Sequence, residues 1–152
     1  MNEPEIIEWH RDPFLISTDP DLLDIDVVHN YLSQQSYWSR DIPRATVEKS
    51  IMESLCFGLY LGTGQIGFGR VVSDYATVAY LGDIFIVERY RRRGLSKWLM
   101  ECIKSHPSLQ GLRRWILATR DAHGLYERFG YTPLKSPGNF MELHQPDIYK
   151  NN

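Results

Sequence analysis

A basic turn that ends in glycine is the stretch of this sequence best suited to bind a ligand. Arg91, Arg92 and Arg93 precede Gly94, and an apolar helical pattern begins at Leu95. A helix N-terminus presents unpaired backbone N–H groups and a partial positive charge, and glycine lets the backbone approach a ligand closely. The turn therefore predicts an anion site that would suit a diphosphate.

The residues around this turn exclude two common types of phosphate-binding site. Neither the P-loop pattern Gly-x-x-x-x-Gly-Lys-Ser/Thr nor the dinucleotide pattern Gly-x-Gly-x-x-Gly is present. The turn follows an apolar run from Val78 to Val87, and ligands of α/β sheets bind where such strands end. The alternative interpretation is a solvated basic turn with no ligand.

Composition limits the classes of protein to consider. The 152 residues suit one domain, and the 43% hydrophobic and 24% charged residues are typical of soluble chains. A net charge of −2 argues against a nucleic-acid partner. Met1 to Arg11 has no apolar signal-peptide core, and no run approaches the ~20 residues of a membrane span. We expect a cytoplasmic protein with no membrane partner.

The two cysteines do not point to a metal or a disulfide. Cys56 and Cys102 lie in apolar stretches, and neither has a Cys or His at metal-ligand spacing. We expect buried, reduced thiols and no metal.

Periodicity predicts the elements of the first half of the chain. We expect a short strand at Phe14–Ser17, then a helix over Leu22–Gln34 with Asp21 or Asp24 as N-cap. A loop over Ser36–Pro43 leads into a second helix carrying Val47, Ile51 and Leu55.

In the second half the apolar pattern changes to that of a sheet. We expect a hairpin of Phe57–Leu61 and Ile66–Ser73, and a strand at Val78–Val87 covered on both faces. The later elements are helices at Leu95–His106 and Asp121–Phe129, the latter capped by Asp121 and ended by Gly130, and strands at Arg114–Thr119, Tyr131–Leu134 and Phe140–Leu143. The order β-α-α-β-β-β-α-β-α-β-β indicates an α/β (α+β) fold, one mixed sheet with helices on both faces.

Two motifs make residues 55–143 resemble the GNAT superfamily of N-acetyltransferases. The family's Gln/Arg-x-x-Gly-x-Gly/Ala motif at a helix start is matched by Arg91 and Gly94, with Ser96 at the small position. Thr119–Tyr131 is similar to the family's Asn-x-x-Ala-x-x-Leu-Tyr-x-x-x-Gly-Phe, with Thr in place of Asn. The resemblance implies one N-acetyltransferase domain over residues 1–152, built on a mostly antiparallel sheet of about seven strands.

By this resemblance the co-substrate is acetyl-CoA, and no metal is implied. The backbone of the strand would pair with the pantetheine arm and polarise the thioester carbonyl, and the N–H groups of the turn would hold the pyrophosphate. The residues concerned are Ile84, Phe85, Ile86, Arg91, Arg92, Arg93, Gly94, Leu95, Ser96 and Lys97.

Tyr126 is the candidate general acid. It occupies the family's tyrosine position, and a phenol can give a proton or a hydrogen bond to a departing thiolate. The alternative is a core position, because Ala122, Leu125 and Phe129 share its helical face.

Asp83 is the candidate base or amine anchor. An attacking amine must lose a proton, and Asp83 is the only charged residue in its strand. The alternative is a structural salt bridge to Arg70, Arg114 or Arg120. His123 is a further candidate base, although we expect it to face solvent.

By the same resemblance, the loop with Tyr37, Trp38 and Arg40 falls on the acceptor side. An aromatic wall could hold a cationic amine, or Trp38 could pin the loop to the core. Phe140, Met141 and Glu142 could close the opposite side.

Together these residues predict direct acetyl transfer to an amine of an unidentified small molecule or peptide, in a ternary complex, by a monomer or homodimer. Three alternatives stay open: a silent acyl-CoA-binding sensor or regulatory module, a nucleic-acid-binding module, and an enzyme with another acyl donor or a hydroxyl acceptor.

Overall fold

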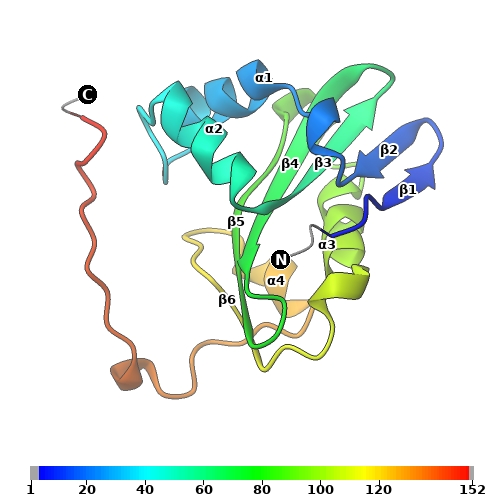
Figure 1. Ribbon diagram of the computed structural model, residues 1–152. Helices are drawn as coiled ribbons and strands as arrows, with labels where there is room; N and C mark the ends of the chain where they lie inside the picture. The colour runs from blue at the N-terminus through cyan, green and yellow to red at the C-terminus, as the bar shows by residue number, and fades with distance from the viewer. Residues whose placement is uncertain (1–3, 151–152) are drawn as a thin grey trace.

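One mixed sheet of six strands forms the centre of the structure, a computed structural model that describes residues 4–150 (Figure 1). Its strands lie in the order β1-β2-β3-β4-β5-β6, and only the pair β5–β6 is parallel. They are β1 (Glu8–Arg11), β2 (Phe14–Ser17), β3 (Leu55–Leu61), β4 (Gly64–Ser73), β5 (Val78–Ile86) and β6 (Arg114–Leu117).

Helices cover both faces of this sheet, as the sequence predicts. They are α1 (Ile25–Asn30), α2 (Arg44–Met52), α3 (Leu95–Ser105) and α4 (His123–Glu127). One core cluster joins α3 to buried sheet residues such as Phe57 and Leu81. The second joins α1 and α2, through Val28 and Val47, to Phe68 and Phe85. Among residues 4–150, no helix has the length and apolar character to cross a membrane.

The first half of the chain departs from expectation in three places. Asp24 caps α1 by accepting a hydrogen bond from the N–H of Val27, but the helix changes to a π-turn over Tyr31–Gln35. Leu55 begins β3 instead of ending the second helix. Strand β1 was not among the expected elements, because its residues lack an apolar alternation, and they are mostly exposed. Its pairing with β2 makes it a strand.

In the second half, the strand expected to be covered on both faces is amphipathic at its start. Val78 and Tyr80 of β5 are 40% and 43% exposed, whereas Ala79 and Leu81 are buried. The helix α4 begins at His123, not at Asp121, and it is preceded by a hydrogen bond from the N–H of Ala122 to Thr119 Oγ1.

The two closing strands expected at Tyr131–Leu134 and Phe140–Leu143 do not form in this structure. The sheet ends at β6, and both segments are irregular. Met141 and Leu143 are 98% and 92% exposed. A strand requires a partner as well as suitable residues, and residues 140–150 run apart from the sheet (Figure 1).

Candidate active site

A β-bulge in β5 is the local irregularity around which the site is built. Phe85 pairs with Phe68 and Gly82 with Arg70, so two residues of β5, Asp83 and Ile84, lie opposite one residue of β4. Asp83 has a φ of 56°. A bulge leaves a residue unpaired and re-aims its side chain, and bulges are common beside active sites.

Gly69 is the β4 residue that makes room for the bulge. A Cβ at this position would lie 2.7 Å from Ile84 Cδ1 and 3.2 Å from Ile103 Cδ1. Because the bulge pushes Ile84 toward β4, only a residue without a side chain fits opposite it without rearrangement.

Beyond the first half of β5, one edge of the strand is open. Pairing with β6 covers Val78 to Leu81, and β6 ends at Leu117. From Gly82 to Ile86, β5 has β4 on one side and no described strand on the other. An open edge presents N–H and C=O groups that can pair with the amides of an extended ligand.

The turn from Arg91 to Gly94 has the backbone geometry of an anion site. Arg92 and Gly94 have φ values of 66° and 76°, and both are exposed. Gly94 precedes α3 and offers no side-chain cap, so the first N–H groups of α3 have no intrahelical partner. Successive N–H groups in such a turn form a concave anion-binding surface.

The three arginines of this turn differ in the contacts that their side chains make. Arg91 donates from Nε to the carbonyl of Ile86 (2.9 Å) and from Nη2 to the hydroxyl of Tyr31 (2.7 Å), so it braces the turn against β5. The guanidinium of Arg93 lies 5.6 Å from the centre of the Tyr90 ring. No described residue forms a hydrogen bond or ion pair with the side chain of Arg92, which leaves its charge available to a ligand.

Tyr126 lies on α4 and is 9% exposed, and its ring packs edge-on against Tyr131 at a centroid distance of 5.9 Å. Burial raises the pKa of its hydroxyl to about 12, and the neighbouring Tyr37 and Asp121 add to the effect. The phenol is therefore protonated at neutral pH. The buried ring fits the core interpretation, and the protonated hydroxyl fits the general-acid interpretation.

Asp83 forms the salt bridge that was the alternative to catalysis. Arg70 Nε donates to Asp83 Oδ2 at 2.7 Å, and Arg70 Nη1 reaches Ser54 Oγ at 3.1 Å. The second carboxylate oxygen, Oδ1, accepts a hydrogen bond from Trp38 Nε1 at 2.9 Å. Asp83 therefore links the loop that carries Trp38 to the bulge.

Tyr37 makes a second connection, between that loop and the segment that follows β6. Its hydroxyl accepts a hydrogen bond from the N–H of Arg120 (2.8 Å), and the Arg120 guanidinium lies 3.9 Å from the centre of its ring. The rings of Tyr37 and Trp38, 38% and 40% exposed, meet edge-on at 5.0 Å. Tyr37, Trp38 and Arg120, which are distant in sequence, therefore lie near Asp83 and the open edge of β5.

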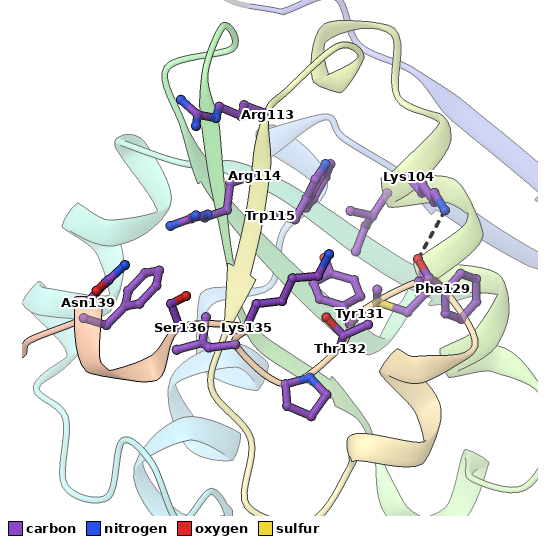
Figure 2. Close-up of a pocket in the computed structure, with 16 residues that line it drawn as sticks. Lys104, Arg113, Arg114, Trp115, Phe129, Tyr131, Thr132, Lys135, Ser136 and Asn139 are labelled. Atoms are coloured by element: carbon purple, nitrogen blue, oxygen red, sulfur yellow. Dashed lines mark hydrogen bonds between the residues drawn. The ribbon is translucent and has the colours of Figure 1, made fainter.

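Other predicted positions lie outside this arrangement. Arg40 is exposed and donates to the carbonyl of Gln34, within the loop's own neighbourhood. His123 is exposed, as expected. Phe140 lies under the guanidinium of Arg114 and lines a cavity (Figure 2) that contains none of Tyr37, Trp38, Asp83 or Tyr126, and Met141 is almost fully exposed. Neither residue therefore closes the side opposite the loop. The contact of Tyr31 with Arg91 was not predicted, because the two residues are 60 positions apart and no local pattern links them.

The region that contains the bulge and the basic turn is similar to a known protein family. A family model described as an acetyltransferase (GNAT) domain matches residues 53–133. This range includes the bulge, the open edge, the basic turn and Tyr126.

Individual relatives extend the similarity beyond that range. A candidate acetyltransferase of Gibberella zeae is 32% identical, with 78% of each chain covered. A crystal structure of a GNAT family protein from Xanthomonas campestris pv. campestris is 51% identical, with a TM-score of 0.89 over 92% of this chain and 99% of that one. A candidate acetyltransferase from Deinococcus radiodurans, 18% identical, is similar in fold alone, with a TM-score of 0.71 over 95% and 96% of the chains.

Proposed function

Because this chain belongs to the GNAT family of acetyltransferases, we propose that it transfers an acetyl group from acetyl-CoA to an amine of a small molecule or peptide. Family membership supports acyl transfer in general. The observation that carries the specific proposal is the continuity of the open β5 edge with the basic turn, which together suit a ligand with amides at one end and a diphosphate at the other.

On the donor side, the backbone does most of the binding. The edge from Ile84 to Ile86 pairs with the amides of the pantetheine arm, and the N–H groups from Arg91 to Lys97 receive the pyrophosphate. Arg92 and Lys97 add full positive charge. Unpaired N–H groups at the bulge polarise the thioester carbonyl as charge develops on its oxygen.

On the leaving-group side, the raised pKa of the Tyr126 hydroxyl favours hydrogen bonding to the thiolate over complete proton transfer. Its pKa of about 12 is well above the roughly 8.5 of an ordinary thiol, so complete proton transfer to a thiolate would cost about 5 kcal/mol. The hydroxyl therefore stabilises the departing thiolate by donating a hydrogen bond, without giving up its proton fully.

On the acceptor side, Asp83 has two roles. Its carboxylate is the base for the amine, and it anchors the loop that carries Trp38. Each of its oxygens accepts one hydrogen bond, and a carboxylate oxygen has a further lone pair. Asp83 can therefore take the proton of the amine, directly or through water, while it remains linked to Trp38 and Arg70. Tyr37, Trp38 and Arg40 shape the acceptor loop.

The reaction proceeds by direct attack, without an acyl-enzyme intermediate. Burial raises the pKa of both thiols, Cys56 and Cys102, to about 12. A thiol that is not ionised at neutral pH is a poor nucleophile.

The test is to replace Tyr126 with phenylalanine and follow CoA release over a panel of amines. We expect kcat to fall by ~10²–10³-fold while the Kd for acetyl-CoA, measured by calorimetry, is unchanged. Tyr80→Phe is the matched control, because Tyr80 is a half-exposed tyrosine of β5. Unchanged kcat in Tyr126→Phe would reduce Tyr126 to a packing role. Acetyl-CoA binding without turnover on any amine would favour a sensor.

A further inference from the structure

Arg70 is a cation at the candidate site whose hydrogen-bond donors are only partly used by the protein. Its Nε donates to Asp83 Oδ2 at 2.7 Å, and its Nη1 donates to Ser54 Oγ at 3.1 Å. The third nitrogen, Nη2, forms no hydrogen bond within residues 4–150, and the side chain is 20% exposed. A guanidinium carries five N–H donors, so Arg70 keeps donors for a ligand.

Gly82 leaves this unpartnered nitrogen without a covering side chain. Gly82 pairs with Arg70 across β4 and β5, so a side chain at residue 82 would project from the same face of the sheet as Arg70. A Cβ built at Gly82 would lie 4.0 Å from Arg70 Nη2, which is van der Waals contact. Glycine therefore avoids a side chain that would lie against the nitrogen next to Asp83.

The charges around Asp83 do not suit an acceptor that is only cationic. Asp83 is paired with Arg70, so an ammonium group that approaches the carboxylate also approaches a guanidinium of like charge. One face of the Tyr37 ring is already occupied by the guanidinium of Arg120, at 3.9 Å from the ring centre. That face therefore cannot hold a substrate cation by cation–π attraction. Both contacts favour an acceptor that carries a negative group beside its amine.

We propose that the acceptor is a free α-amino acid, bound as a zwitterion along the Arg70–Asp83 pair; this inference rests on the acetyl transfer proposed above. The α-ammonium group lies at Asp83, the proposed base, and the α-carboxylate accepts a charge-assisted hydrogen bond from Arg70 Nη2. Asp83 and Arg70 are in direct contact, so the two charges of a matching ligand must also lie close together. The amine and carboxylate of an α-amino acid meet this requirement, because one carbon carries both.

The reaction changes the charge of this acceptor. One amine proton passes through Asp83 to solvent, and the nitrogen forms its bond to the acetyl carbon as the C–S bond breaks with its electron pair on sulfur. The second proton neutralises the CoA thiolate. The product keeps its carboxylate but has no ammonium group, so it is no longer attracted to Asp83. The amino acid should therefore bind more tightly than its N-acetyl product.

The first experiment compares each of the protein amino acids with its carboxamide, which represents a peptide N-terminus, and with the amine left by decarboxylation. CoA release by the native chain gives kcat/KM per unprotonated amine, because the three compounds titrate at different pH values. For the best amino acid we expect a value about 10²-fold above both analogues, since each lacks the carboxylate that Arg70 binds.

The possible outcomes separate this inference from the function on which it rests. Equal or faster turnover of the carboxamide or the decarboxylated amine would overturn the amino-acid assignment and leave acetyl transfer in place. Turnover of other amines in the panel described above, with no amino acid acetylated, would have the same meaning. No turnover of any amine would remove the proposed function as well.

The second experiment tests whether Arg70 recognises the carboxylate. Arg70→Lys keeps a positive charge beside Asp83 but loses the planar fork of donors. We expect the preference for the amino acid over its decarboxylated amine to fall at least ~10-fold, mainly through a higher KM for the amino acid. An unchanged Kd for acetyl-CoA, measured by calorimetry, verifies that the variant is folded. A variant that keeps the native preference would overturn the role of Arg70.

Arg114→Lys is the matched control for that variant. Arg114 is an exposed arginine of the neighbouring strand β6, and its guanidinium lies 4.9 Å from the centre of the Phe140 ring. Figure 2 shows its side chain on the opposite side of β6 from Trp115. The same substitution at this position should leave the preference for amino acids unchanged. A loss of preference in both variants would show that general positive charge, and not the Arg70 guanidinium, selects the carboxylate.

Discussion

Replacing Gly94 with alanine separates the conformation of the basic turn from its charge. Gly94 has a φ of 76°, and a Cβ built there meets no atom within 4 Å. The substitution therefore adds no steric clash with the rest of the protein. What it adds is the cost of a left-handed conformation for an L-residue, roughly 1–2 kcal/mol. The smaller entropy of the unfolded alanine chain offsets about 0.4–1 kcal/mol of that cost.

The net expectation for Gly94→Ala is a loss of about 1 kcal/mol of stability, which lowers Tm by roughly 2–4 °C in a domain of this size. Gly124→Ala is the matched control, because its Cβ also meets no atom within 4 Å and its φ is not positive. Gly124 lies in α4, where alanine should stabilise by roughly 0.5–1 kcal/mol. Gly94→Asn should be milder than Gly94→Ala, since asparagine tolerates the left-handed region.

The assay is urea unfolding at one protein concentration, combined with calorimetric titration of acetyl-CoA. A common m-value for the variants makes the midpoints comparable. Distortion of the turn should remove at least one hydrogen bond to the pyrophosphate, so we expect about tenfold weaker acetyl-CoA binding by Gly94→Ala. If Gly94→Ala and Gly124→Ala shift the midpoint in the same direction, or if Gly94→Ala binds acetyl-CoA normally, the reasoning about the turn is wrong.

Two further predictions concern buried polar groups. His106 is 1% exposed, its Nε2 has no partner among the described residues, and burial lowers its pKa. Below about pH 6.5 the unfolded chain takes up a proton that the native imidazole resists, so stability should fall as the pH decreases. Urea unfolding at two pH values should show this dependence weakened in His106→Phe, and an unchanged dependence would contradict the assignment. Arg70→Met should cost about 3 kcal/mol by leaving Asp83 without its ion partner, and adding Asp83→Asn should recover part of it. A double-mutant cycle with no coupling would contradict that role of the pair.

The elements nearest the proposed donor side could be predicted from the sequence because their signals are local. The apolar stripe of α3, the glycine before it and the strand that precedes the turn are all contained in residues 78–106. Each signal depends on helix period, capping chemistry or side-chain size, which neighbouring residues determine. The helix that carries Tyr126 could be predicted from local signals as well. Its start, however, depends on the Thr119 side chain and not on the expected Asp121 cap.

The proposed acceptor side could not be predicted in the same way, because its contacts join distant residues. Trp38 reaches Asp83, and Tyr37 reaches Arg120, which is 83 residues away. The bulge depends on cross-strand register, because its extra residue is visible only once Gly69 is placed opposite Ile84. No spacing within one element carries that information.

The errors at the two ends of the chain have a common physical cause. Residues 8–11 have little apolar alternation and still form a strand, because β2 offers them an edge. Residues 140–143 have the apolar side chains of a strand and form none, because no described strand pairs with them. Strand formation at a sheet border is decided by the neighbouring edge more than by intrinsic preference.

The open edge of β5 also bears on how such a protein can diverge. Its hydrogen-bonding groups belong to the peptide backbone, so side-chain substitutions between Gly82 and Ile86 leave the row of donors and acceptors in place. The loop of Tyr37 and Trp38, in contrast, contacts Asp83 and Arg120 through its own two aromatic side chains. Mutation can therefore reshape one half of the site while the other keeps its hydrogen-bonding pattern. Proteins that descend from one ancestor could in this way come to bind new acceptors while they keep the same backbone contacts to a common donor.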